Sequence, residues 1–351
     1  MSVTVVDDDD KTLIVCWPAD PNPMTEDIIE QFIENGESKK IRLILVDSYE
    51  GEMYHQIKIE RKSCTLILRY LEMFKEVYLI KSSFFVENTI EYVKKMYPEY
   101  SRLQCGGDLK YEWLAFEKCH LLKHPEQYVD EFARVDRHFI SLNGSPRYYR
   151  GLLLDTMMRH NMIDTMYYSW LCPYPSHIFK TFDSNKEVLL DVNRTDLFKD
   201  FALVPEEYHH GLIDLFVESA ADGFNYKDVF ITEKTWKPII RKKPFFGFNS
   251  AGYYETLQNA GFKLYDKLFD YSFDSIIDHN ERFNKFMGNI YKIAHMPLEQ
   301  VKELAYLHSD DIEFNFTHAW NIKPEIPEVL KPYYQNLEFL FINSFEIMAS
   351  K

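Results

Sequence analysis

The sequence predicts an α/β protein with two lobes, on three observations. The chain has 351 residues, which exceeds the size at which one hydrophobic core stops growing. Hydrophobic residues make up 46% of the chain and aromatic residues 16%, enough for a packed core. Apolar runs of strand length alternate with helix-like segments, a pattern typical of parallel sheets with helices on their faces.

The first lobe is predicted over residues 1–130. Thr25 is the expected N-cap of its first helix, Gly36 lies just past the end of that helix, and Pro98 ends the next one. Residues 100–135 are expected to form a helical connection or a linker. The expected strands are TLIVCW (12–17), IRLILVD (41–47), EVYLIKSS (76–83) and, more weakly, CTLILRY (64–70).

The second lobe is predicted over residues 131–275, followed by a helical tail over 276–351. Ligands of open α/β sheets bind at the carboxyl ends of strands, here expected in a cleft between the lobes. Strands are expected at 137–144, 212–218 and 244–248, helices at 146–160 and around 204–208, and a helix followed by a short strand within 250–266.

Charge and cysteine content narrow the functional classes. The net charge of −15 disfavours a general nucleic-acid binder, since an acidic surface repels phosphate backbones. No window approaches eighteen apolar residues, and the start of the chain lacks the pattern of a signal peptide, so we expect a cytoplasmic protein without a membrane span. The five cysteines show no C-x-x-C spacing, so no metal site is expected.

The first candidate site is the stretch LNGSPRYYR. Asn143 belongs to a tight turn, Ser145 suits the N-cap, and Pro146 suits the first helical position. Arg147 and Arg150 then lie in the first turn, although a helix start already carries partial positive charge. Such a cluster fits an anion, for example a diphosphate. Alternatively, both arginines pair with acids of the surrounding surface.

The second candidate site is FVES…YKDVFITEKTW. Glu218 ends a strand, Thr232 is the expected cap of the next helix, and Glu233 and Lys234 follow in its first turn. Glu233 suits a helix start, whereas Lys234 does not. An ordinary ion pair between Glu233 and Lys237, four positions on, is the alternative for the glutamate.

These residues resemble the alpha-1,3-fucosyltransferase family, glycosyltransferase family ten. In that family a glutamate ends a strand, a Thr-Glu-Lys starts the next helix, and a Pro-bearing strand follows, as in FVES…YKDVFITEKTWKPIIRKKPFF. The chain resembles more closely still a set of virus- and phage-encoded glycosyltransferase-like proteins. In those, LNxxPRxxR precedes TEKTxKP, as 142–150 precedes 232–238 here. The resemblance covers roughly residues 137–275.

The resemblance implies a GT-B fold, with two Rossmann-like lobes, an interlobe cleft and a helical C-terminal tail. It also implies metal-independent transfer of a sugar from a nucleotide-sugar donor, with no other cofactor, to a glycan or another hydroxyl acceptor. Lys234 and an arginine of the 147/150 pair would hold the diphosphate, and Glu218 and Glu233 would bind sugar or ribose hydroxyls. The implied donor-binding set is Asn143, Arg147, Arg150, Glu218, Tyr226, Thr232, Glu233 and Lys234.

The catalytic base is sought among acids that follow strands of the first lobe. Asp47 and Glu50 are the candidates after IRLILVD. The chain departs from the fucosyltransferases in carrying VESAADG where they carry an Asn-containing segment, so the sugar is left open. If the protein is viral, the host cytoplasm is its expected location.

Two other functions stay open at this stage. The first is glycosylation of a hydroxylated base in viral DNA, which needs base flipping and a basic cleft. A basic strip, 234–243, fits that reading, whereas the net charge opposes it. The second is a non-catalytic nucleotide- or sugar-binding module. A metal-dependent GT-A enzyme would need Asp-x-Asp after a strand, and LLDVNRTD has the wrong spacing.

Overall fold

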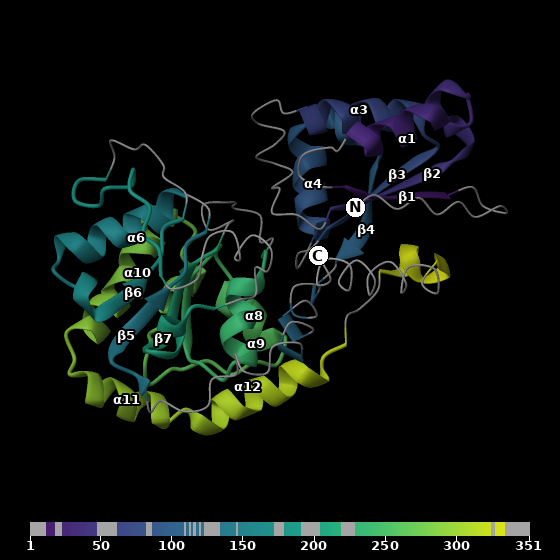
Figure 1. Ribbon diagram of the computed structural model, residues 1–351. Helices are drawn as coiled ribbons and strands as arrows, with labels where there is room; N and C mark the ends of the chain where they lie inside the picture. The colour runs from purple at the N-terminus through teal and green to yellow at the C-terminus, as the bar shows by residue number, and fades with distance from the viewer. Residues whose placement is uncertain are drawn as a thin grey trace. The chain divides into compact units, whose positions relative to one another are not determined.

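The computed structural model describes most of the chain in separate stretches. They are residues 12–17, 23–47, 62–81, 86–108, 110–111, 114, 117–118, 121–122, 134–144, 147–171, 179–190, 204–218, 229–323 and 327–333. These residues divide into two compact units (Figure 1). The first unit holds the first sheet with its helices, Val229, Phe230 and the described residues from Lys323 onward. The second unit holds the described residues of 113–222 and 231–322.

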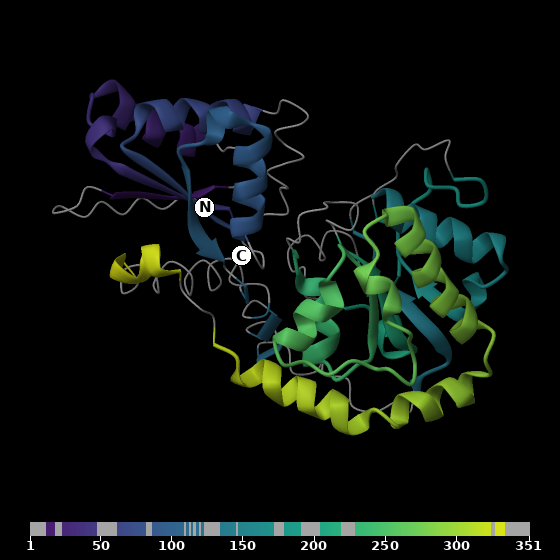
Figure 2. The ribbon, with the colours of Figure 1, turned by 180° about the vertical axis from the view of Figure 1, so that it is seen from behind.

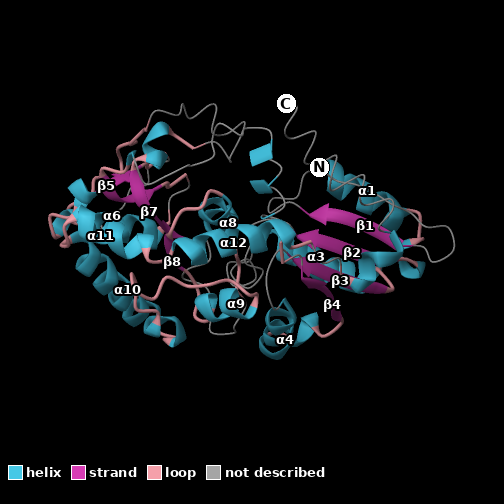
Figure 3. Ribbon diagram, turned by 90° about the horizontal axis from the view of Figure 1, so that it is seen from below, coloured by secondary structure: helices cyan, strands magenta, loops and turns pink. Residues whose placement is uncertain are grey.

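The first unit contains a four-stranded parallel sheet in which the strands pair in chain order, β1-β2-β3-β4 (Figure 3). The strands are β1 (Thr12–Trp17), β2 (Arg42–Asp47), β3 (Glu76–Lys81) and β4 (Leu103–Asp108). The helices are α1 (Pro23–Glu34), α3 (Lys62–Met73) and α4 (Val86–Met96), with 3-10 turns at Ser38–Lys40, Pro98–Tyr100 and Glu328–Tyr333.

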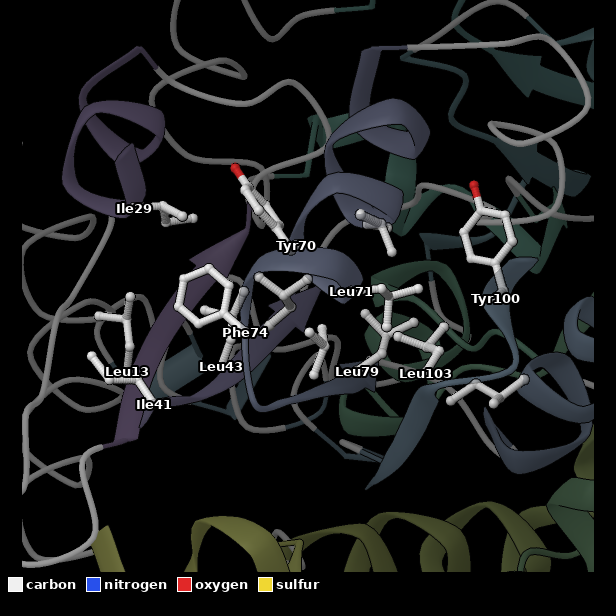
Figure 4. Close-up of a cluster of buried hydrophobic side chains, with 14 of the residues drawn as sticks. Leu13, Ile29, Ile41, Leu43, Tyr70, Leu71, Phe74, Leu79, Tyr100 and Leu103 are labelled. Carbon is white, nitrogen blue, oxygen red and sulfur yellow. The ribbon is translucent and has the colours of Figure 1, made fainter. Parts of the chain in front are cut away.

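One face of this sheet packs against the helices in an apolar core (Figure 4). Alternate residues of β2 and β3, such as Leu43 and Leu79, point into it because successive strand side chains face opposite sides. Tyr70 of α3 and Phe74, just after it, pack into the same core. The rings of Tyr70 and Phe74 contact each other edge to face, with their centroids 6.0 Å apart. Apolar burial of this kind is the main force that stabilises the unit.

Three expectations for the first unit were wrong. Residues 64–70 form part of α3 rather than a strand, because Ile67, Tyr70, Leu71 and Phe74 follow helical spacing and are all buried. Thr25 lies inside the first turn of α1, which begins at Pro23. Strand β4, LQCGGD, lies within the residues for which a helical connection or a linker was expected. It was missed because glycines weaken the strand signal of a sequence. The strands expected at 12–17, 41–47 and 76–83 are confirmed as β1, β2 and β3, the last two with shorter bounds.

The second unit contains a four-stranded parallel sheet with the order β6-β5-β7-β8. The chain runs from β5 outward to β6 on one side, then returns to place β7 and β8 on the other side of β5. The order therefore reverses between β5 and β7. The strands are β5 (Arg137–Ser141), β6 (Met166–Tyr168), β7 (Gly211–Val217) and β8 (Phe245–Phe248).

Helices cover both faces of the second sheet (Figures 1 and 2). Helix α6 packs on α10, where the rings of Tyr149 and Phe283 lie 5.1 Å apart. Helix α8 lies on the opposite face and contacts α12. The helices are α6 (Tyr148–Arg159), α8 (Glu233–Ile240), α9 (Tyr253–Asn259), α10 (His279–Ala294), α11 (Leu298–Tyr306) and α12 (Ser309–Asn321), with 3-10 turns at Ile163–Thr165, Glu206–His209 and Ser272–Ser275.

The core beneath α10 is built from stacked aromatic rings. Phe246 of β8 lies parallel to Phe269, with ring centroids 4.1 Å apart, and to Phe286, at 4.8 Å. Gly247 leaves room on the other face of β8, because a Cβ there would come 2.3 Å from the ring of Phe216. The high aromatic content of the sequence therefore serves packing in this unit.

The second unit also differs from expectation in places. The expected strand after Gly261 does not form, the expected helix around 204–208 is a 3-10 turn, and β6 was not predicted. The expected helical character is confirmed over 279–321 by α10, α11 and α12, which belong to the unit of the second sheet, whereas 324–326 and 334–351 of the predicted tail lie outside the described residues. In the described ranges no helix is both long and apolar enough to cross a membrane.

Candidate functional site

The candidate site lies at the carboxyl ends of β5 and β7, between which the order of the second sheet reverses. In open α/β sheets this switch point is where ligands bind. The stretch after β5 leads into α6, and the stretch after β7 leads to α8. Both motifs singled out in the sequence therefore start from neighbouring strands. We call this the switch-point site and define it by Arg147, Arg150, Glu218, Thr232 and Lys234.

Asn143 ties the ends of β5 and β6 together. Its backbone N–H donates to Ser169 Oγ at 3.0 Å, and its side-chain amide donates to the carbonyl and hydroxyl oxygens of Ser141 at 3.3 and 3.2 Å. Its carbonyl accepts from the backbone of Leu171 at 3.1 Å. Asn143 is buried. Its backbone links the end of β5 to the residues after β6, and its side-chain amide is held by Ser141 of its own strand.

The two arginines of the first motif have different surroundings. Helix α6 begins at Tyr148, two residues later than expected, so Arg147 occupies the N-cap position and Arg150 lies in the first turn. Arg147 is exposed, whereas Arg150 is buried and its Nε donates to the carbonyl of Val217 at 3.0 Å. Arg150 thus links α6 to the end of β7. Ser145 and Pro146 lie outside the described residues.

Glu218 lies directly after β7, as expected, and its carboxylate is enclosed by the start of α8. Its Oε1 accepts from the backbone N–H of Thr232 and from the Thr235 hydroxyl, both at 3.1 Å. Its Oε2 accepts from the Thr232 hydroxyl at 2.6 Å. The side chain is buried, so a carboxylate from the sheet satisfies donors at the start of α8.

Thr232 is the N-cap of α8, as predicted. Its Oγ1 accepts from the backbone N–H of Lys234 at 3.3 Å. The Lys234 ammonium bends back over the same turn, 3.4 Å from Thr232 Oγ1 and 2.7 Å from Glu233 Oε1. The structure therefore pairs Glu233 with its neighbour Lys234, and both side chains are largely buried.

The pKa values of the two glutamates move in opposite directions. Burial raises the pKa of Glu218, opposed mainly by the positive charge of Lys234. Burial acts in the same direction on Glu233, but the charges of Lys234 and Lys237 outweigh it and bring its pKa to about 2. Glu233 is therefore ionised at neutral pH. The Lys234 ammonium at the start of α8 therefore has the adjacent Glu233 carboxylate as its counter-ion.

The basic strip 234–243 is largely buried rather than exposed. Arg241 pairs with Glu117 at 2.9 Å, and both side chains are fully buried. Lys243 donates to the carbonyls of Tyr208, at 2.6 Å, and Gly211. Lys237 is also buried, and Lys242 pairs with Glu313 of α12 at 2.6 Å. These cations hold α8 in place, and the strip does not form the basic surface considered for nucleic acid.

A second buried carboxylate lies on β7, four residues before Glu218. Asp214 accepts from the hydroxyl of Tyr208 at 2.6 Å. Burial raises the pKa of Asp214 and lowers the pKa of Lys243, while the attraction between the two charges opposes both shifts. Sequence reasoning missed Asp214, although an acid in the middle of the apolar run GLIDLFV is a signal that could have revealed it.

The remaining predicted residues are not part of this arrangement. Glu50 and Tyr226 lie outside the described residues. Asp47 is the last residue of β2 in the first unit, and its side chain is also outside the description. Thr235 and Tyr253, which were not predicted, join the site through the hydroxyl pair Thr235 Oγ1 and Tyr253 OH at 2.7 Å. Among the described residues, no cluster of three or more His, Cys, Asp or Glu side chains could hold a metal ion.

Comparison of the chain with protein-family models, with curated proteins and with solved structures found no match in any of the three. The resemblance to glycosyltransferase family ten therefore rests on the motifs around Arg147 and Glu218 alone. That Lys234 and one of the arginines contact a common anion stays a prediction.

Proposed function

We propose that the protein is a glycosyltransferase of the GT-B type, which moves a sugar from a nucleotide-sugar donor to a hydroxyl acceptor. One observation carries the proposal: the two donor-binding motifs follow β5 and β7, on either side of the reversal in strand order. Arg150 joins them physically through its hydrogen bond to Val217, the residue before Glu218. A switch point supplied with cations is a common setting for phosphate groups.

In the proposed reaction the second unit binds the nucleotide sugar. Arg147 and the start of α6 lie after β5, and Lys234 lies after the neighbouring strand. Cleavage of a sugar–phosphate bond develops negative charge on the departing diphosphate, and fixed cations in a site of low polarity stabilise that charge. The acceptor hydroxyl would lose its proton to a carboxylate of the first unit, for which Asp47 and Glu50 stay the candidates.

A nucleotide panel tests the proposal. The full chain is heated alone and with UDP, GDP, CMP, dTDP or ADP. A ligand at a hundred times its Kd is expected to stabilise the protein by about 2.7 kcal/mol. Failure of every nucleotide to raise the melting temperature would overturn the proposed donor site.

A second measurement separates an enzyme from a binding module. The nucleotide that stabilises the chain identifies the donor class, and release of that nucleotide from its sugar conjugate is then followed with a panel of hydroxyl acceptors. Turnover that disappears in Lys234→Ala and Arg147→Ala supports the transferase. Binding without turnover on any acceptor would instead identify a non-catalytic nucleotide-binding module.

A further inference from the structure

Glu218 belongs to a hydrogen-bonded chain that runs from α9 to the start of α8. Thr235 donates its proton to Glu218 Oε1, because a carboxylate only accepts. A hydroxyl has one proton, so the Tyr253 hydroxyl must donate to Thr235 Oγ1 at 2.7 Å. The order of donation is therefore Tyr253 to Thr235 to Glu218, and all three side chains are buried.

The other oxygen of Glu218 fixes the orientation of the Thr232 hydroxyl. Thr232 donates its single proton to Glu218 Oε2 at 2.6 Å. The two lone pairs of Thr232 Oγ1 are then turned toward the backbone N–H and the ammonium of Lys234, at 3.3 and 3.4 Å. The carboxylate thus determines which way the cap of α8 presents its acceptor to Lys234.

We propose that Glu218 is a positioning residue of the switch-point site: its buried carboxylate fixes the start of α8 and, through Thr232, the place of the Lys234 ammonium. The inference rests on the proposed role of Lys234 in donor binding. It gives Glu218 a different role from the one implied by the family resemblance, in which this glutamate binds a hydroxyl of the donor.

Burial and bonding both favour positioning over ligand contact. Glu218 is 1% exposed. A carboxylate has about four acceptor positions, and three of those of Glu218 are filled by donors from Thr232 and Thr235. A backbone N–H such as that of Thr232 cannot turn away, so Oε1 is committed to the helix.

The decisive variant is Glu218→Gln, which keeps the shape of the side chain. Its amide oxygen must stay at the Oε1 position, where the fixed N–H of Thr232 points. The NH₂ group then faces Thr232 Oγ1, donates to it, and competes with Lys234 for the same lone pairs. Thr235→Val removes one donor to Glu218 without touching Thr232, and Tyr253→Phe is the matched control that leaves all three donors in place.

Two readouts are measured on the full chain. The first is amide hydrogen exchange across 232–240, where the N–H groups of Thr235 and Trp236 bond to the carbonyl of Thr232, with α10 as the internal reference. The second is the Kd of the nucleoside diphosphate that binds the wild type best. We expect Glu218→Gln to speed exchange in α8 but not in α10, and to weaken binding about tenfold, as for a lost hydrogen bond to a charged group.

Thr235→Val should change both readouts in the same direction by a smaller amount, and Tyr253→Phe should change them least. Unchanged exchange at the start of α8 in Glu218→Gln would overturn the inference. So would a loss of affinity confined to Glu218→Gln with Thr235→Val at the wild-type value, because that pattern identifies a ligand contact. If no nucleotide binds the wild type, the proposed function fails separately, and the exchange measurement alone decides whether Glu218 anchors α8.

Discussion

The two sheets each have four parallel strands, yet they differ in strand order and in what is buried beside them. The first sheet pairs in chain order, so it has no reversal, whereas the second reverses between β5 and β7. Among the described residues, every buried Asp, Glu, Lys and Arg side chain belongs to the second unit.

This difference indicates how the two units are specialised. Removing a charged side chain from water costs free energy, so buried charges are expected where they form ion pairs or contribute to function. In the second unit several of them lie beside α8: Asp214 on β7, Glu218 directly after β7, and Arg241 paired with Glu117. The first unit, with its apolar core around Tyr70 and Phe74, is stabilised without them.

Breaking a buried ion pair of the second unit should have the largest effect on stability. Arg241→Met leaves the Glu117 carboxylate buried without its 2.9 Å partner, and we expect a loss of about 3–5 kcal/mol in the free energy of unfolding. The matched change in the first unit, Arg42→Met, breaks a partly exposed pair with Glu76 and should cost about 1 kcal/mol or less.

Denaturant unfolding followed by circular dichroism measures both losses. The double variant Glu117→Gln/Arg241→Met should recover part of the loss, because it also removes the uncompensated carboxylate. Equal losses for Arg241→Met and Arg42→Met would contradict the contrast between the two units.

Asp274 of the second unit and Glu76 of the first should contribute to the pH dependence of stability with opposite signs. In the second unit, burial raises the pKa of Asp274 to about 6, against the opposing amide groups of Glu255 and Tyr254 and the charge of Arg282. The folded protein then keeps a proton that the unfolded chain releases above about pH 4, so this contribution falls as pH rises from about 4 to 6. Asp274→Asn should remove a dependence on the order of 2 kcal/mol.

In the first unit, the hydrogen bond from Arg42 lowers the pKa of Glu76. Its contribution is present above the pKa of the unfolded chain and is lost as pH falls through the lower folded value. Because the carboxyl is partly exposed, Glu76→Gln should remove only a few tenths of a kcal/mol. Free energies of unfolding of both variants and the wild type, measured from pH 3.5 to 7, check the signs; slopes of the same sign would contradict the assignment.

Nucleotide binding should respond to charge in the second unit alone. Lys234→Ala and Arg147→Ala each remove a cation from the switch-point site, and we expect the Kd of the bound nucleoside diphosphate to rise about tenfold or more. Lys81→Ala, at the carboxyl end of β3 in the first unit, is the matched loss of one positive charge. Isothermal calorimetry measures the three affinities. If Lys81→Ala weakened nucleotide binding equally, the effect would come from the net charge of the protein rather than from the switch-point site.

The smallest effect is expected from removing the counter-anion of Lys234. Glu233→Gln eliminates the carboxylate that lies 2.7 Å from the ammonium, so an external anion no longer competes with it. Inorganic pyrophosphate has no sugar hydroxyl groups, so it reports on the contact with the anion alone. We expect the affinity of Glu233→Gln for pyrophosphate to be about two- to fivefold higher than that of the wild type, because this factor corresponds to the free energy of a modest ion pair. Competition of pyrophosphate with the bound nucleotide gives the value. A weaker affinity in the variant would show that Glu233 supports anion binding.

Much of the fold could be predicted from local pattern. Apolar runs located β1, β2, β3, β5, β7 and β8 to within about three residues, and placed Glu218 at the end of its strand. The capping role of Thr232 also followed from residue type and position. The glycine-bearing β4 and the short β6 were missed because their local sequence patterns are weak. Each of these strands is stabilised by pairing with its neighbour in the sheet, which a local pattern does not reveal.

The candidate site could be predicted only in part, because its side chains are paired over long distances in the sequence. Lys237, Arg241 and Lys243 have the spacing of a solvated basic helix, and nothing local signals that they are buried. Their burial depends on partners such as Glu117, which comes from a distant segment. The engagement of Glu218 by Thr235 likewise follows from how α8 docks on β7, which residue patterns do not specify.

The strand order described above also has a consequence for how the chain folds. In the first sheet each new strand pairs with the one made just before it, so every pairing closes a short loop at low entropic cost. In the second sheet β7 must pair with β5 after β6 has intervened, and the Glu117–Arg241 pair joins residues 124 positions apart. Folding rate falls as contacts become less local. We therefore expect the first sheet, with its helices α1, α3 and α4, to form early as the chain emerges from the ribosome, and the start of α8 to reach its final place among the last.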